Sequence, residues 1–205
     1  MQKKLNVAVL GSTGYVGLEL IKLLSKHPNV KINFLGSEHP KQSLSKINSK
    51  FYKINLKSNQ TFDPSKSDFV FLALPHGVSQ FYVKKLFDKI KIIDLSADFR
   101  LDKLSTYKKS YESKHICSNL LKKFVYGLPE INKNLIKKSN NIAVPGCYPT
   151  SILLPLIPLL KKQLIKNQNI IIDSKSGYSG AGKKFDLKNI RTNNDYNFYN
   201  YNTNS

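Results

Sequence analysis

A glycine-rich turn between two short apolar segments constrains the fold of this chain more than any other feature. Residues 5–10 are largely apolar and include two β-branched valines, which predicts a buried strand, and the heptapeptide GSTGYVG at 11–17 follows directly. Apolar residues then recur at helical spacing as far as residues 27–28, and residues 30–35 predict a second strand. A strand, turn, helix and strand in this order form a βαβ unit, so we expect an α/β protein with a parallel sheet.

The three glycines of this turn suit a bound nucleotide. Their spacing is G-x-x-G-x-x-G, not the commoner G-x-G-x-x-G, but the physical roles are the same. Gly11 allows the tight turn, Gly14 lets a pyrophosphate approach the backbone, and Gly17 lets the helix pack on the sheet. A plain turn is the alternative, but the helix N-terminus that follows attracts anions. The predicted cofactor contacts are Gly11, Ser12, Thr13, Gly14, Tyr15 and Val16.

The end of the second strand leaves the choice between NAD and NADP open. NAD sites usually place an acidic residue there to bind the ribose hydroxyls. Ser37 could bind a 2′-phosphate through its hydroxyl, whereas Glu38, one position later, would repel that phosphate if it pointed inward.

Residues 68–74 predict another buried strand, which ends in Pro75-His76-Gly77. Open α/β sheets bind ligands at the carboxyl ends of their strands, so Pro75 and His76 are candidate neighbours of a cofactor. An exposed loop histidine is an equally simple interpretation of His76. A helix is predicted over residues 80–88.

A further strand at 90–95 ends in a loop that contains Asp98 and Arg100. These two side chains either pair with others in a structural loop or contact a substrate. Residues 126–132 are rich in turn formers and predict a connection to the strand that precedes Cys147. His115 and Cys117 have no neighbouring cluster of ligands in the sequence, so no metal site is predicted.

Cys147 lies in the turn PGCYPT at 145–150, directly after an apolar run. A cysteine presented at such a turn can act as a nucleophile in its thiolate form, and an inert cysteine in a loop is the alternative. The apolar residues 151–160 predict a buried helix whose N-terminus near Cys147 would favour the thiolate. Pro155 and Pro158 predict that this helix is kinked or starts late.

Residues 170–173 predict one more strand, and a second glycine-rich loop follows at 174–184. Its glycines and two lysines suit a bound anion, and a flexible linker is the alternative.

The formal net charge of +20 raises the question of nucleic-acid binding. Only Arg100 and Arg191 are arginines, and the lysines are spread along the chain. Proteins that bind nucleic acids usually contact bases and phosphates through arginine side chains. We therefore interpret the charge as a solvated basic surface without a nucleic-acid partner. No apolar run reaches the ~18 residues of a membrane span, no signal peptide is recognised, and two distant cysteines predict no disulfide framework. We therefore expect a cytoplasmic protein.

Six motifs together resemble the N-acetyl-γ-glutamyl-phosphate reductase family. The resemblance implies a Rossmann-type, doubly wound parallel sheet over residues 1–146, followed at 147–205 by the beginning of an α/β substrate and dimerisation domain. In their order along the chain, the motifs are GSTGYVGLE (11–19), LALPHGVS (72–79), IDLSADFR (93–100), YGLPEIN (126–132), PGCYPT (145–150) and SGYSGAG (176–182).

The resemblance also implies a reaction. Cys147 attacks the acyl phosphate of N-acetylglutamyl 5-phosphate, phosphate leaves, and the thioester is reduced with NADPH to the semialdehyde, a step of arginine biosynthesis. It favours NADP, with Ser37 at the 2′-phosphate. In the second glycine-rich loop Ser179 and Gly180 are predicted cofactor contacts, and Arg100 is a candidate to bind the substrate. A small-molecule substrate and a homo-oligomer are expected.

Two features depart from the family pattern. Glu38-His39 occupy the place where an arginine often follows the serine, and the sequence ends at Ser205, before a His-Arg-His motif that supplies the acid/base histidine. The chain is therefore interpreted as an amino-terminal fragment with little activity alone. The alternatives are a related acyl-phosphate reductase, such as aspartate-semialdehyde dehydrogenase or aminoadipyl-phosphate reductase, and a nucleotide-binding module without catalysis.

Overall fold

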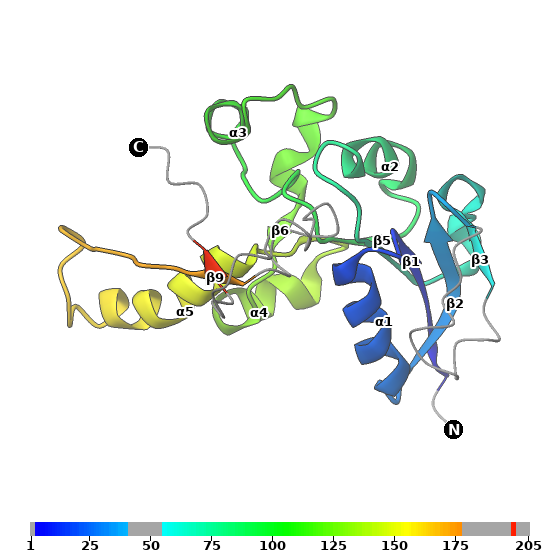
Figure 1. Cartoon of the computed structure of the whole chain (residues 1–205), viewed down its shortest axis with the longest axis horizontal. Helices are drawn as coiled ribbons and strands as arrows, with labels where there is room; N and C mark the ends of the chain where they lie inside the picture. Colours follow the sequence, from blue (N-terminus) through cyan, green and yellow to red (C-terminus); the bar gives the residue numbers. More distant parts are fainter. Residues whose placement is uncertain (1–2, 41–54, 178–197, 200–205) are drawn as a thin grey trace, which may run out of the picture. The chain divides into compact units, whose positions relative to one another are not determined.

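The computed structural model describes residues 3–40, 55–177 and 198–199 (Figure 1). The chain divides into two compact units, residues 1–146 and 147–205, and each unit is described by itself.

The first unit is built on a seven-stranded sheet with the order β3-β2-β1-β4-β5-β7-β6. Every pairing in it is parallel, and the strand order reverses between β1 and β4, as in a doubly wound sheet. The predicted Rossmann-type fold is confirmed. Its strands are β1 (Leu5–Leu10), β2 (Val30–Ser37), β3 (Leu56–Ser58), β4 (Phe69–Leu72), β5 (Lys91–Asp94), β6 (Val125–Tyr126) and β7 (Asn141–Ala143).

Helices connect these strands, and the βαβ unit predicted from the glycine turn is present as β1, α1 and β2. The prediction of a turn-rich connection at 126–132 is wrong, because α4 begins within it. Pro129 is at the first helical turn, where a missing N–H costs nothing, and Glu130 complements the positive helix N-terminus. The helices are α1 (Tyr15–Lys26), α2 (Ser79–Leu86), α3 (Leu104–Tyr111) and α4 (Pro129–Lys138), with short 3₁₀ turns η3 (Asn59–Thr61), η4 (Pro64–Lys66) and η5 (Ser118–Lys123).

Apolar side chains cover both faces of this sheet. Val9 of β1 belongs to a cluster with Ile21 of α1, whereas its neighbours Ala8 and Leu10 belong to a cluster with Val83 of α2. Successive strand residues point to opposite faces, so α1 and α2 cover different sides (Figure 1). Burial on both faces explains why residues 7–10 of β1 are apolar without interruption.

The described part of the second unit contains α5 (Cys147–Lys161), an extended segment, and the antiparallel pair β8 (Ser176–Gly177) and β9 (Phe198–Tyr199). The predicted late start is wrong, because α5 begins at Cys147 and contains both prolines. The expected burial of this helix is also absent from the described structure, since no residue of α5 is buried.

The strand predicted at residues 170–173 is not formed. Among the described residues no strand pairs with this segment, and Ile171 is 94% exposed. A strand requires a pairing partner, which apolar composition alone does not supply.

In the described chain, no helix has the length and apolar character that crossing a membrane requires.

Candidate functional site

The glycine turn lies at the carboxyl end of β1, where the packing leaves no room for side chains. Gly11 has a φ of +78°, and a Cβ there would lie 2.2 Å from the carbonyl oxygen of Ala73. A Cβ on Gly17 would lie 2.4 Å from the Gly11 carbonyl oxygen. The Gly11 N–H donates to Oδ1 of Asn59 at 3.2 Å. The turn is thus pressed against the end of β4, and the N-terminus of α1 is placed at the edge where ligands bind.

Replacing Gly11 by alanine is expected to destabilise the first unit by at least about 2 kcal/mol, because the new Cβ meets both a positive φ and a backbone carbonyl. Urea unfolding followed by circular dichroism measures this loss. Gly14→Ala is the control: Gly14 has a φ of −72°, and a Cβ at this position would lie 3.6 Å from its nearest neighbour, the Gly11 carbonyl oxygen. Equal losses in the two variants would contradict the packing argument.

The hydroxyl residues of the turn do not all face outward. Ser12 is fully buried, and its hydroxyl donates to the carbonyl oxygen of Gly36 at 2.7 Å. Thr13 Oγ1 lies 3.2 Å from Ser37 Oγ, which also accepts the N–H of His39 at 3.1 Å. Ser12 therefore shapes the turn, while Thr13 and Ser37 are brought together across the ends of β1 and β2.

Tyr15 and Val16 occupy the exposed first turn of α1, with 46% and 57% of their surfaces accessible. Of the predicted cofactor contacts, they are placed best to meet a ligand through their side chains, whereas Gly11 and Gly14 offer backbone.

The turn after β4 is held by the buried carboxylate of Asp98. The Gly77 N–H donates to both oxygens of Asp98, at 2.9 and 3.1 Å, and His76 Nδ1 lies 2.9 Å from Oδ1. Gln80 Nε2 donates to the same oxygen at 3.1 Å, and the Tyr107 hydroxyl does so at 3.3 Å. His76 is exposed in this turn, as one of its two interpretations expected, and its imidazole is in addition paired with Asp98. The alternative that Asp98 pairs with other side chains in a structural loop is confirmed.

His76 is fixed on its other side as well. Its Nε2 lies 3.2 Å from the Tyr107 hydroxyl and 3.4 Å from the Ser113 hydroxyl, and its ring lies 4.8 Å from that of Tyr111. The side chain still keeps 35% of its surface accessible. His76 is a rigidly held imidazole at the edge of the sheet, beside the exposed Pro75.

Arg100 joins the ends of two strands. Its Nε donates to the Val144 carbonyl oxygen at 2.8 Å, and Nη2 donates to the Leu95 carbonyl oxygen at 3.0 Å. Burial raises the pKa of Tyr126, while the nearby Arg100 guanidinium acts in the opposite direction. Val144 precedes Cys147 by three residues in the chain, so Arg100 fixes the backbone that leads to the cysteine.

Asp94, at the end of β5, is a buried residue that the sequence interpretation missed. Its carboxylate accepts the Ser79 hydroxyl at 2.8 Å and the Ser96 hydroxyl at 2.7 Å. Burial is the main cause that raises the pKa of Asp94 from 3.8 to about 6, against the opposing hydrogen bonds. The signal available in the sequence was an acidic residue directly after two isoleucines of the predicted strand.

The raised pKa of Asp94 predicts a pH-dependent stability. The folded chain holds the proton of Asp94 more tightly than the unfolded chain. Protonated Asp94 therefore adds to the free energy of unfolding, fully below pH ~4, and this added stability is lost as the pH rises to about 6. The total loss is about 3 kcal/mol. Urea unfolding at pH 4–7 should show this slope in the wild-type chain and in the exposed control Asp102→Asn, but not in Asp94→Asn. A constant difference between wild type and Asp94→Asn over this range would contradict the prediction.

Cys147 is the exposed first residue of α5 in the second unit, whereas Cys117 is buried in the first. An exposed thiol at the first residue of a helix is accessible to a substrate. Burial raises the pKa of Cys117 to about 11. Of these two thiols, Cys147 is the one placed for reaction.

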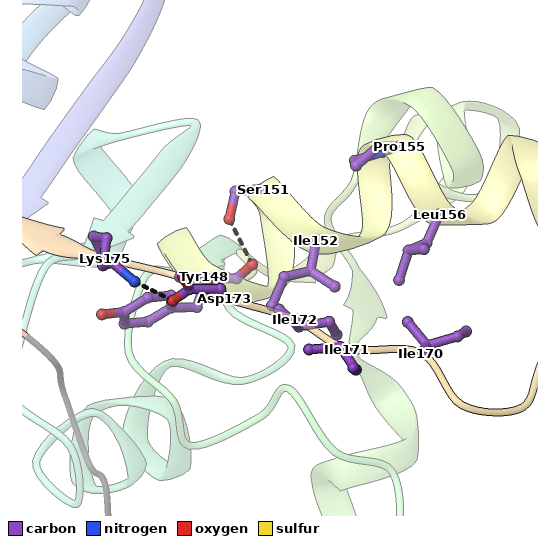
Figure 2. A pocket seen from close by; sticks show the side chains of 11 residues that line it. Tyr148, Ser151, Ile152, Pro155, Leu156, Ile170, Ile171, Ile172, Asp173 and Lys175 are labelled. Carbon is purple, nitrogen blue, oxygen red and sulfur yellow. Dashed lines mark hydrogen bonds and ion pairs between the residues drawn. The ribbon is translucent and has the colours of Figure 1, made fainter.

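A pocket of about 470 Å³ with both apolar and polar lining residues lies within the second unit. Figure 2 shows Ile152 and Leu156 of α5 facing the extended segment that carries Ile170 and Ile172. Ser151 donates to the Tyr148 carbonyl oxygen at 2.9 Å inside α5. The composition of α5 predicted an apolar helix. In this pocket the extended segment partly covers its apolar side chains.

Ser179 and Gly180, predicted as cofactor contacts, lie outside the described residues. In the part of the chain that is described, no group of three or more His, Cys, Asp or Glu side chains could hold a metal ion.

The sequence matches two family profiles. "Semialdehyde dehydrogenase, NAD binding domain" matches residues 6–139, and "Semialdehyde dehydrogenase, dimerisation domain" matches residues 147–205. Among curated relatives, the chain is 48% identical over 195 residues to an N-acetyl-gamma-glutamyl-phosphate reductase of Ehrlichia canis and 50% identical over 191 residues to one of Caldicellulosiruptor bescii. These matches cover 93% and 89% of the chain but 56% and 54% of the relatives, so the chain spans about half their length.

Solved structures share the fold. An aspartate semialdehyde dehydrogenase II of Vibrio cholerae aligns with a TM-score of 0.63 at 22% identity, over 89% of this chain and 49% of that one. An aspartate semialdehyde dehydrogenase of Candida albicans, solved with NADP, aligns with a TM-score of 0.52 at 17% identity, over 86% of this chain and 56% of that one.

Proposed function

The chain belongs to the semialdehyde dehydrogenase family, and on this basis we propose that it serves the NADPH-dependent reduction of N-acetyl-L-glutamyl 5-phosphate to N-acetyl-L-glutamate 5-semialdehyde in arginine biosynthesis. The observation that carries the proposal is the 48% identity to a reductase of that name over 93% of the chain. The structural neighbours that act on aspartate semialdehyde are too distant in sequence to bear on the substrate.

The residues of the first unit fit a dinucleotide. Gly11 and Gly17 allow the turn to pack closely against the neighbouring backbone, and Gly14, at the capping position of α1, leaves room where a Cβ would stand, so a pyrophosphate could approach the helix N-terminus there. Thr13 and Ser37 would meet the adenosine ribose, while Tyr15, Val16, Pro75 and His76 would border the rest. NADP is preferred to NAD here on the family resemblance.

Cys147 supplies the nucleophile in this proposal. Its Sγ bonds to the acyl carbon, the bond from that carbon to the phosphate oxygen breaks, and phosphate leaves with the electron pair. NADPH, when bound, supplies the hydride that reduces the thioester carbon. The C–S bond then breaks, the thiolate returns to Cys147, and the semialdehyde leaves. The overall reaction consumes one hydride and one proton.

Arg100 has two roles in the proposal. Its bonds to Val144 and Leu95 use only two of the five N–H groups of a guanidinium, so others could bind a substrate carboxylate or phosphate. The dimerisation-domain match supports a homo-oligomer, and the basic surface is assigned no nucleic-acid partner. We place the reaction in the cytoplasm.

A single-turnover assay in the oxidative direction tests the proposal. Mixing the chain with NADP⁺ and N-acetylglutamate semialdehyde, without phosphate, should form up to one equivalent of NADPH as Cys147 is acylated. Aspartate semialdehyde and aminoadipate semialdehyde should give none. Reaction with only one of these non-acetylated aldehydes would assign the chain to a related reductase. Binding of NADPH without reaction of any aldehyde would indicate a nucleotide-binding module.

A further inference from the structure

Exposed apolar side chains gather around the first turn of α2. Phe81 keeps 57% of its surface accessible, and Val78, the residue before the helix, keeps 37%. The Phe81 N–H donates to the Val78 carbonyl oxygen at 3.2 Å, and residues three apart lie on one side of a helix. The opposite side of α2 is buried and contains Ser79, Gln80, Val83 and Leu86. Phe81 therefore points away from the core that α2 covers.

A second segment adds Ile116 to this surface. The Ile116 N–H donates to Oε1 of Gln80 at 2.7 Å, and Sγ of Cys117 donates to the Gln80 carbonyl oxygen at 3.7 Å. This segment thus lies beside the helix, next to the residue that precedes Phe81. Ile116 keeps 43% of its surface accessible. Val78, Phe81 and Ile116 together form the α2 patch, a set of exposed apolar side chains from two segments of the first unit.

Lysines surround the α2 patch. Lys84 and Lys85 are exposed, and they lie three and four residues after Phe81 on the same side of the helix. Burial raises the pKa of the Cys117 thiol, and Lys84 lies close enough to oppose this rise, which places its ammonium group toward the segment of Ile116. Six more lysines are exposed on residues 103–123, the segment that carries Ile116, namely Lys103, Lys108, Lys109, Lys114, Lys122 and Lys123.

The positive charge around the α2 patch is not neutralised by ion pairs. In the part of the chain that the structure describes, none of these lysines forms a salt bridge. The nearest exposed acids along the chain are Asp88, just beyond the end of α2, and Glu112. An apolar surface with a rim of unpaired charges of one sign is typical of a site where a partner of opposite charge docks.

The charge and the depth of the α2 patch decide which kind of partner fits it. A second copy of this chain would bring lysines against lysines, because the net charge is +20. Duplex DNA would attract the lysines, but its charged backbone offers no apolar surface to cover Phe81. Val78 and Ile116 expose less than half of their surfaces, which is too little to enter the apolar layer of a membrane. A protein with both acidic and apolar side chains matches the charge and the patch.

We propose that the α2 patch is the docking surface of an acidic protein. Apolar side chains of the partner cover the three residues of the patch, and its carboxylates pair with Lys84, Lys85 and Lys114. The charges speed and orient the encounter, while the apolar contact keeps the partner bound. This inference does not depend on the proposed function, because none of these residues is assigned to cofactor or substrate.

An amphipathic helical peptide of about 16 residues, with leucines on one face and glutamates on the other, is the probe. Fluorescence anisotropy of the labelled peptide gives its dissociation constant for the full chain and for each variant. Phe81→Ser and Ile116→Ser should each weaken binding about tenfold, because each removes an apolar contact. Leu135→Ser is the matched control. Leu135 is 58% exposed on α4, which also carries two lysines in its last turn, and its replacement should change the affinity by less than about twofold.

Charge is tested separately from apolar contact. Lys84→Ala/Lys114→Ala should weaken binding about tenfold, whereas Lys137→Ala/Lys138→Ala, which removes the same charge from α4, should have less than about a twofold effect. The lysine variants keep the test valid if a serine variant fails to fold. A peptide with alanines in place of the leucines should bind about tenfold more weakly than the parent peptide.

Several results would overturn the assignment. Absence of binding, equal affinity for the leucine and alanine peptides, or equal losses in the patch and control variants would each contradict a docking surface at α2. Binding of duplex DNA or of phosphatidylserine vesicles that Phe81→Ser weakens as much as it weakens peptide binding would contradict a protein partner.

Discussion

Replacing Cys147 by serine is expected to lower the rate of single-turnover NADPH formation by about 10⁴-fold or more, because in the proposed reaction its thiolate is the group that bonds to the acyl carbon. Cys147 is exposed at the first residue of α5, so the change removes a nucleophile without opening a cavity. The stability of the chain should therefore stay within about 0.5 kcal/mol of wild type. Stopped-flow absorbance of NADPH and urea unfolding measure the two quantities.

Cys117→Ser is the matched control. Cys117 is buried, its Sγ lies 3.7 Å from the Gln80 carbonyl oxygen, and burial raises its pKa to about 11. The Cys117→Ser variant should form NADPH at the wild-type rate, because a thiol with so high a pKa supplies almost no thiolate. Loss of the reaction in Cys117→Ser with retention in Cys147→Ser would reverse the assignment of the nucleophile.

Replacing Asp98 by alanine is expected to cost the first unit about 3–5 kcal/mol, because the change removes a buried carboxylate that accepts hydrogen bonds from several donors. The N–H of Gly77, Nε2 of Gln80 and the imidazole of His76 all lose a partner. The turn that carries His76 should loosen, so NADPH binding should weaken by more than the loss of stability alone explains. Urea unfolding and NADPH titration at a temperature where the variant is folded separate these effects.

Asp98→Asn should recover part of the loss, because its carbonyl oxygen still accepts the Gly77 N–H. Asp102→Ala removes an exposed carboxylate from the same stretch of chain. It should change the free energy of unfolding by no more than about 0.5 kcal/mol. The role given to Asp98 would be wrong if Asp98→Ala were as stable as Asp102→Ala.

The sequence predicted the βαβ unit well, because its elements are specified locally. The run at 5–10 is largely apolar, since both faces of β1 are covered, and the glycines mark the turn. Gly11 and Gly17 are required by contacts within this unit and with the adjacent strand end. Local pattern and tertiary packing agree here, and such agreement makes a prediction reliable.

The buried network around Asp98 could not be predicted in the same way. His76, Gln80, Asp98 and Tyr107 come from separate segments, and only the folded sheet brings them together. The available signal was weak: Ser79, Gln80 and Val83 are buried positions of α2, and two of these three are polar. A buried polar residue needs partners, but the sequence does not name them.

The predictions for the second unit failed where they relied on apolar content alone. Residues 151–160 and 170–173 are rich in apolar side chains, yet in the described structure α5 has no buried residue and the isoleucine segment is unpaired. A side chain is buried, and a strand is paired, only where another segment packs against it. Composition could therefore predict the helix but not the segments that pack around it. Cys147 at the helix start was nevertheless predicted correctly as a presented thiol.

Acylation of Cys147 is tested most directly by the mass of the intact chain after mixing with N-acetylglutamyl 5-phosphate, followed by peptide mapping. One N-acetylglutamyl group should be found on Cys147 and should disappear on addition of NADPH as the semialdehyde is released. An unmodified Cys147, or an acyl group on Cys147 that NADPH does not remove, would contradict the proposed reaction.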